Sequence, residues 1–261
     1  MNMKKKVLFT SIVVTLLVLV GCGNTNEATK SKENVEESVL DWSYKGEKGP
    51  DNWEKLNKKY KLKSTKEQSP IDISKEAKVE ALASEAIHFQ PGYFELLRQD
   101  QQLTLTPMPV EGKENILTFN EEDYLLTAIN LHVPSEHKIQ GKQYDGELQL
   151  KFESKEKKNL IMAVMLEEGE KNYALDQVSN EMTKLKNNKK VTTKEPISTL
   201  ALIPQEREYI AYQGSFTAPP TTEGVQWLVM KKAITLEKSQ LKELTKVLKD
   251  NVRPIQKQKA N

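Results

Sequence analysis

Residues 128–139 read A-I-N-L-H-V-P-S-E-H-K-I and contain two of the three histidines in this 261-residue chain, His132 and His137. Glu136 stands beside the second histidine, and the residues leading to His132 alternate between apolar and polar, as in a half-buried strand. Histidine and carboxylate side chains are common zinc ligands. The stretch is therefore a candidate metal site, and the rest of the chain must show whether the site is complete.

The remaining hydrophobic pattern predicts a sheet-dominated α+β domain. Short alternating or β-branched runs between turn signals predict strands at residues 103–107, 124–133, 146–152, 160–166, 199–204 and 225–235. Apolar residues at helical spacing predict two surface helices, over residues 175–185 and 241–248.

The first residues indicate export and lipidation. A basic start (residues 1–6) and an apolar core (residues 7–20) are followed by Leu-Val-Gly-Cys, which resembles a bacterial lipobox ending at Cys22. We expect residues 1–21 to be a lipoprotein signal peptide, residues 22–40 a lipidated N-terminus with a flexible tether, and residues 41–261 the folded domain. An ordinary signal peptide or an N-terminal membrane anchor are the alternatives.

Charge gives no support for a nucleic-acid partner. The chain has 39 Lys and Arg residues against 37 Asp and Glu residues, and three of the lysines lie in the predicted signal peptide. The two signs are then nearly balanced, so no strong attraction to a polyanion is expected. Lipidation at Cys22 instead predicts a membrane partner, on the extracytoplasmic face of a cell membrane.

Ordered motifs over residues 41–261 carry a resemblance to a known family. They are W-S-Y at 42–44, G-P-x-x-W at 49–53, Q-S-P-I-D-I at 68–73, H-x-P-S-E-H at 132–137, Y-x-x-E-L-x-L at 144–150, Y-x-G-S-F-T-A-P-P at 212–220, E-G-V-x-W at 223–227 and N-x-R-P-x-Q at 251–256. In this order they resemble the α-class carbonic anhydrases. The resemblance implies a central, twisted, mostly antiparallel sheet of about ten strands with short peripheral helices.

The resemblance also implies a zinc site, from which this sequence departs. In active members three histidines hold zinc in a cleft, and the zinc-bound water attacks CO₂. Asn130 and Gln149 match two of those histidine positions, and only His132 is retained. Amides are poor zinc ligands. Lys151 matches an apolar wall position of the CO₂ pocket, where its charge would oppose a bound cation.

Three other matches are retained. Glu136 and Thr217 match the carboxylate and hydroxyl that orient the zinc-bound hydroxide in active members, and Glu147 matches a hydrogen-bond acceptor of the third histidine. Buried carboxylates on these strands can also hold the sheet together without any metal. The structural role is expected for His137 as well.

Three functions follow as hypotheses. The first is a membrane-tethered domain without CO₂ hydratase activity or cofactor, which binds an envelope protein, a glycan or a small anionic or polar ligand. Its cleft would be lined by Asn130, His132, Glu147, Gln149 and Lys151. The second is an active zinc carbonic anhydrase (a carbonate dehydratase), or another metalloenzyme, with a substituted ligand set. The third is a purely structural element of the cell envelope.

Overall fold

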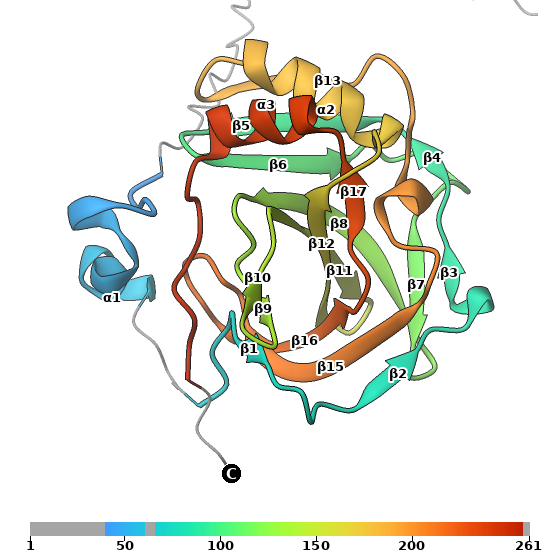
Figure 1. The fold of residues 1–261 in the computed structure, drawn as a ribbon, viewed down its shortest axis with the longest axis horizontal. Coiled ribbons are helices and arrows are strands. Elements are labelled where there is room, and N and C mark those ends of the chain that lie inside the picture. The colour runs from blue at the N-terminus through green and yellow to red at the C-terminus, as the bar shows by residue number, and fades with distance from the viewer. Residues whose placement is uncertain (1–39, 61–65, 258–261) are drawn as a thin grey trace, which may run out of the picture. The chain divides into compact units, whose positions relative to one another are not determined.

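The protein is described by a computed structural model over residues 40–60 and 66–257. The predicted signal peptide, Cys22 and residues 23–39 of the predicted tether lie outside these described residues. The main feature of the described chain is one twisted sheet of twelve strands (Figure 1). The predicted sheet-dominated α+β fold is confirmed, with two strands more than the ten expected because several edge strands are only two or three residues long.

The elements have the following bounds. The large sheet contains β2 (Val79–Ala81), β3 (Ile87–His88), β5 (Phe94–Gln99), β6 (Gln102–Pro107), β7 (Ile116–Phe119), β8 (Glu122–His132), β11 (Gly146–Ser154), β12 (Asn159–Glu168), β13 (Lys189–Thr192), β15 (Glu208–Ser215), β16 (Glu223–Met230) and β17 (Ile234–Leu236). Two small sheets contain β1 (Asp72–Ile73), β9 (Lys138–Ile139) and β10 (Lys142–Gln143), and β4 (Pro91–Gly92) with β14 (Ile197–Ser198). The helices are α1 (Trp53–Leu56), α2 (Tyr173–Lys184) and α3 (Lys238–Leu248), with 3₁₀ turns η1 (Gly46–Lys48), η2 (Pro50–Asn52), η3 (Lys58–Tyr60), η4 (Ser84–Ala86) and η5 (Thr199–Leu202).

The large sheet is antiparallel except around β12. Its order is β13-β5-β6-β8-β11-β12-β16-β15-β2, and β12 runs parallel to both β16 and β17. Every residue from Leu160 to Leu166 in β12 is buried. A continuous apolar run of this kind is typical of a strand covered on both faces.

Each face of the sheet carries its own core. Leu160, Met162 and Val164 of β12 point into the larger core, which also contains the buried side chains of α2 and α3. The alternate residues Ile161 and Ala163 point into a smaller core around Trp227. The large core therefore lies on the side of the sheet that the helices cover.

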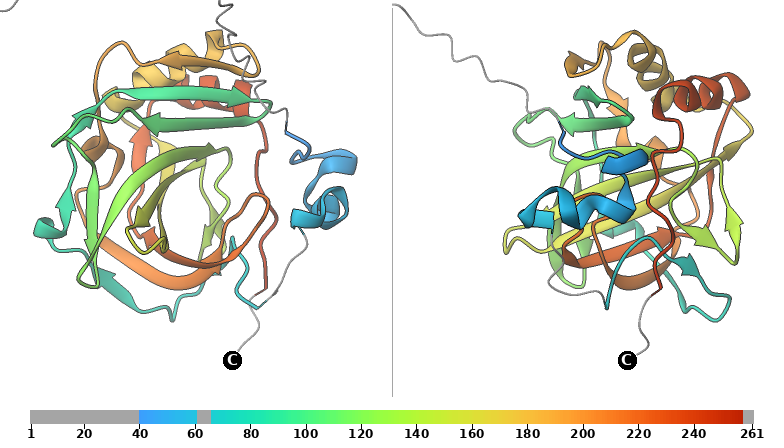
Figure 2. Two further views of the ribbon diagram at one scale, coloured as in Figure 1. Left: turned by 180° about the vertical axis from the view of Figure 1, so that it is seen from behind. Right: turned by 90° about the vertical axis from the view of Figure 1, so that its left-hand side faces the viewer.

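Both predicted helices form, with defined N-termini. The Asn172 side chain accepts a hydrogen bond from the Leu175 backbone N–H at 3.1 Å and so caps α2. In α3, Glu237 and Gln240 form a capping box. The two helices lie side by side near β5 and β6 (Figures 1 and 2).

Two of the strand predictions need correction. Residues 199–204 do not form a strand, because η5 occupies Thr199–Leu202. Thr199 and Leu202 are buried while the two residues between them are exposed, which is the spacing of a 3₁₀ turn and not of a strand. The predicted strand at 225–235 is two strands, β16 and β17, separated by a bend after Met230.

None of the helices in the described residues is long and apolar enough to cross a membrane.

Gly214 in β15 gives a test of the packing around Trp227. A Cβ added at Gly214 would clash with Ser69 Oγ and lie 2.8 Å and 2.9 Å from ring carbons of Tyr212 and Trp227. We expect Gly214→Ala to lower the free energy of unfolding by about 2 kcal/mol, because the buried rings cannot move away cheaply. Denaturant unfolding measures the change.

The matched control for Gly214→Ala is Gly92→Ala, where a new Cβ meets no atom within 4 Å. It should change stability by less than about 0.5 kcal/mol. Equal stability of the two variants would contradict the packing described here.

Candidate functional site

Strands β8 and β11 bring most of the predicted site residues onto one face of the sheet. Their antiparallel register forms three neighbouring pairs: His132–Glu147, Asn130–Gln149 and Ala128–Lys151. Side chains two residues apart on a strand share a face, so all six project to the same side. That side is the one with the smaller core, because Gln149 is also paired with Ala163 of β12.

The Gln149 amide is bonded inside the protein at both of its ends. Its Nε2 donates to Glu136 Oε2 at 2.7 Å and to Glu147 Oε1 at 3.0 Å. Its Oε1 accepts a longer hydrogen bond of 3.4 Å from the hydroxyl of Thr217. Gln149 is 1% exposed. The amide thus links two buried carboxylates and a hydroxyl.

Four donors converge on the Glu147 carboxylate. Oε2 accepts from the backbone N–H groups of Glu136 (2.9 Å) and His137 (2.8 Å), and Oε1 accepts from His137 Nδ1 (2.8 Å) and from Gln149. Burial alone would raise the pKa of the Glu147 carboxyl, but His137, through its charge and hydrogen bonds, lowers it to about 2. Glu147 therefore acts as an ionised anchor for the 136–137 turn.

His137 is held on both sides of its ring. Besides Glu147 at Nδ1, its Nε2 lies 2.6 Å from the Tyr212 hydroxyl, which in turn lies 2.9 Å from Ser69 Oγ. These contacts give His137 the structural role that the sequence predicted.

The segment after α3 completes the surroundings of Glu136 and His132. The backbone N–H of Arg253 donates to Glu136 Oε1 at 2.8 Å. The Asn251 side chain accepts from the Val133 N–H and donates to the Leu131 carbonyl. Both residues lie in the N-x-R-P-x-Q motif at 251–256, but this function of Asn251 and Arg253 was not predicted from the sequence. Their presence in a motif was the available signal.

His132 and Asn130 each present a buried atom without a hydrogen-bond partner among the described residues. His132 Nδ1 lies 2.7 Å from the Asn251 carbonyl oxygen, which can only accept, so Nδ1 carries the proton. His132 Nε2 is buried and unpaired, 3.6 Å from Glu136 Oε2. Asn130 Oδ1 is likewise buried and unpaired.

Lys151 places a cation at the outer end of the same face. The residue is half-buried, and its Nζ lies 5.6 Å from the centre of the Phe216 ring. Burial lowers the pKa of the Lys151 ammonium to about 8, while the charge of Glu136 opposes the shift. The ammonium makes no ion pair with any residue in the described part of the chain.

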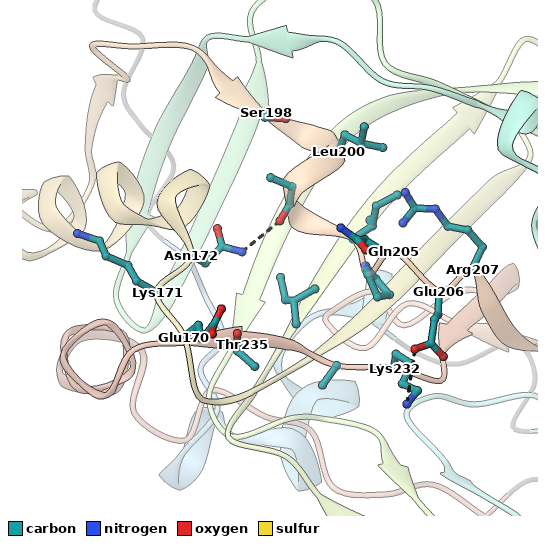
Figure 3. A pocket seen from close by; sticks show the side chains of 15 residues that line it. Glu170, Lys171, Asn172, Ser198, Leu200, Gln205, Glu206, Arg207, Lys232 and Thr235 are labelled. Atoms are coloured by element: carbon teal, nitrogen blue, oxygen red, sulfur yellow. Dashed lines mark hydrogen bonds and ion pairs between the residues drawn. The ribbon is translucent and has the colours of Figure 1, made fainter.

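An open hollow of about 650 Å³ lies elsewhere, between η5, β17 and the segment before α2 (Figure 3). None of the predicted site residues lines it. Two of its lysines are already paired, Lys171 with Asp176 at 3.0 Å and Lys232 with Glu206 at 3.8 Å. The β8–β11 face, defined as the side chains of Asn130, His132, Glu147, Gln149 and Lys151, is the stronger candidate site.

Comparison with known proteins agrees with this geometry. The family model described as eukaryotic-type carbonic anhydrase matches residues 48–260. This chain belongs to the eukaryotic-type carbonic anhydrase family.

Individual relatives cover the same region. A carbonic anhydrase of Neisseria gonorrhoeae is 31% identical over 217 residues, which are 82% of this chain and 84% of the relative. The α-carbonic anhydrase of Thermovibrio ammonificans, solved with the inhibitor sulfanilamide, has a TM-score of 0.76 and 29% identity over 84% of this chain and 96% of its own. A dioscorin solved in complex with ascorbate has a TM-score of 0.73 and 26% identity over 83% of this chain and 94% of its own.

The residues present on the β8–β11 face do not fit the zinc ion that carbonic anhydrases use. Within residues 40–60 and 66–257 no group of three His, Cys, Asp or Glu side chains could hold a metal ion. His132 supplies the single imidazole of this face, and the Gln149 amide is already bonded to two carboxylates. The nearby Lys151 ammonium adds charge repulsion against a divalent cation.

Glu147→Gln tests whether the carboxylate anchors the site. The substitution keeps the size of the side chain but places an NH₂ group among four donors, so at least two of them lose their acceptor. We expect the free energy of unfolding to fall by about 3 kcal/mol at pH 7. The control is Glu153→Gln, also on β11, which removes an exposed ion pair with Lys157 and should change the free energy of unfolding by less than about 0.5 kcal/mol.

The same variant should have a flatter acid response. Glu147 has its folded-state pKa lowered from 4.5 to about 2, so its stabilisation is present above pH 4.5 and is lost as the pH falls toward 2. The wild-type chain should therefore lose stability more steeply than Glu147→Gln across this window. Parallel stability curves, measured by denaturant unfolding at each pH, would contradict the ionised anchor.

Proposed function

We propose that this carbonic anhydrase domain does not hydrate CO₂ and serves as a binding module tethered to the outer face of a cell membrane. The observation that carries the proposal is the bonding of Gln149. An imidazole that donates one N–H to a carboxylate keeps a lone pair for a metal, whereas the Gln149 NH₂ group spends both hydrogens on Glu136 and Glu147. The side chain at the third ligand position thus links two carboxylates, and its nitrogen is not left free to bind a metal.

The β8–β11 face supports a binding role in place of catalysis. Glu136 and Thr217 would orient a metal-bound hydroxide in an active member, but here both are engaged with Gln149. A dioscorin of the same fold was solved with ascorbate, which supports the view that this fold can hold a small organic molecule. As the larger partner of the tethered domain we propose an envelope protein or a glycan. We do not propose a nucleic-acid partner.

The tether is proposed from the sequence. The lipobox-like run ending at Cys22 predicts cleavage before that cysteine and its diacylation, and two acyl chains hold a protein stably on a membrane. Residues 23–40 would then separate the folded domain from the bilayer, where its partners would lie.

Zinc content and CO₂ hydration test the missing activity. The full chain, purified and supplied with zinc, should retain far less than one equivalent and show no hydration above buffer. Asn130→His with Gln149→His should gain about one equivalent of zinc, because it restores three imidazoles on one face. Asn130→His alone is the control and should not, since the Gln149 cross-link remains. One equivalent of tightly bound zinc in the native chain, or turnover that sulfanilamide inhibits, would overturn the proposal.

Cys22→Ser tests the anchor. Cells grown with labelled palmitate should label the wild-type protein and not the variant, because both acyl chains are attached through the Cys22 thiol, which serine lacks. Intact-mass measurement of the wild-type protein should show a diacylated N-terminus beginning at residue 22. An unlabelled wild-type protein that still sediments with membranes would favour an N-terminal membrane anchor instead.

A further inference from the structure

The β8–β11 face carries two buried acceptors without a partner and one cation without an ion pair. His132 Nε2 and Asn130 Oδ1 are buried acceptors with no hydrogen-bond partner among the described residues. The Lys151 ammonium is a donor that forms no ion pair within the same part of the chain. Unpaired buried polar groups are costly, so two such acceptors on the same face as a cation without an ion pair indicate a ligand that satisfies them.

The register places these groups within reach of one small molecule. Asn130 occupies the pair between those of His132 and Lys151, so the three lie on consecutive rungs of the β8–β11 ladder. Ala128, the residue opposite Lys151, has only a methyl side chain. Asn130 and Lys151 are half-buried, whereas His132 is 2% exposed, so a ligand would enter from the Lys151 end.

Charge decides the kind of ligand and its orientation. The Lys151 ammonium repels a cation and attracts an anionic oxygen. The Glu136 carboxylate, 3.6 Å from His132 Nε2, disfavours an anionic oxygen at the inner end. The lone pair on His132 Nε2 and the Asn130 oxygen instead accept from a hydroxyl group.

We propose that the β8–β11 face binds a small oxyacid anion that carries its own hydroxyl, of the α-hydroxycarboxylate class, with the carboxylate at Lys151 and the hydroxyl donating to His132 Nε2. The inference rests on the proposed function, because a zinc ion would need the same His132 nitrogen. Most Lys151 side chains carry a proton at neutral pH, since burial lowers the pKa only to about 8.

Glycolate and acetate test the proposal as a matched pair of probes. Both are monoanions of two carbons, and only glycolate has the hydroxyl. Calorimetric titration of the full chain in detergent should show saturable binding of glycolate, about tenfold tighter than acetate, because one buried hydrogen bond distinguishes them.

Substitutions assign the two ends of the ligand. Lys151→Met should weaken both probes at least about tenfold, and Lys151→Arg should largely restore them, because it returns the charge. His132→Phe should abolish the preference for glycolate over acetate. The control Lys157→Met removes an exposed lysine that is paired with Glu153 and should leave both affinities unchanged.

Two results would overturn the inference. The first is no saturable glycolate binding by a folded wild-type chain. The second is that glycolate and acetate bind with equal affinity, both to the wild-type chain and to Lys151→Arg. Lys151→Arg keeps the charge, so this result can be read even if Lys151→Met fails to fold. Zinc analysis of the same sample separates the two proposals. A zinc-free chain that does not bind glycolate would overturn only this inference. A zinc-loaded chain would overturn the proposed function as well.

Discussion

The buried Glu147 carboxylate is the constraint on which the site depends. Because it accepts four hydrogen bonds, it fixes the turn at Glu136 and His137 against β11 and sets the side chain of Gln149. An ionised group in so dry a place persists only while its donors are complete. The network therefore has one satisfied arrangement, and it extends through His137 to Tyr212 and to Ser69.

The hydrogen bonds of Glu136 and Thr217 are completed by groups of the protein itself, which limits the ligands that the site can hold. Glu136 has both oxygens engaged, by the Arg253 N–H and by Gln149, and the Thr217 hydroxyl donates to Gln149 as well. These groups need no metal to complete their hydrogen bonds. On the same face, His132 Nε2 and Asn130 Oδ1 have no hydrogen-bond partner among the described residues, and the Lys151 ammonium has no ion pair there. The polar capacity of the site thus points to a ligand that is neutral or anionic.

The sequence predicted the strands and the residues of the site better than it predicted the hydrogen bonds between those residues. Strands with a strict period, such as β8 and β11, were predicted within two residues of their ends, because one face is buried and the alternation is clear. Residues 199–204 were misread since an apolar run of six residues does not distinguish a strand from a 3₁₀ turn. The bonds of Gln149, and the role of Asn251 on β8, depend on segments far apart in the chain, and no local pattern encodes them.

Retention of the family motifs in this chain follows from folding and does not require catalysis. Ser69, Tyr212, Asn251 and Arg253 all lie in those motifs. Their hydrogen bonds join separate segments of the chain, to Ser215, His137, Val133 and Glu136 respectively. The larger core, under α2 and α3, lies on the opposite face of the sheet and contains none of the β8–β11 face residues. Amide side chains at Asn130 and Gln149 are therefore compatible with the sheet, its core and its motifs. In this chain the motif residues hold the scaffold together, and both hydrogens of the Gln149 amide are bonded to buried carboxylates.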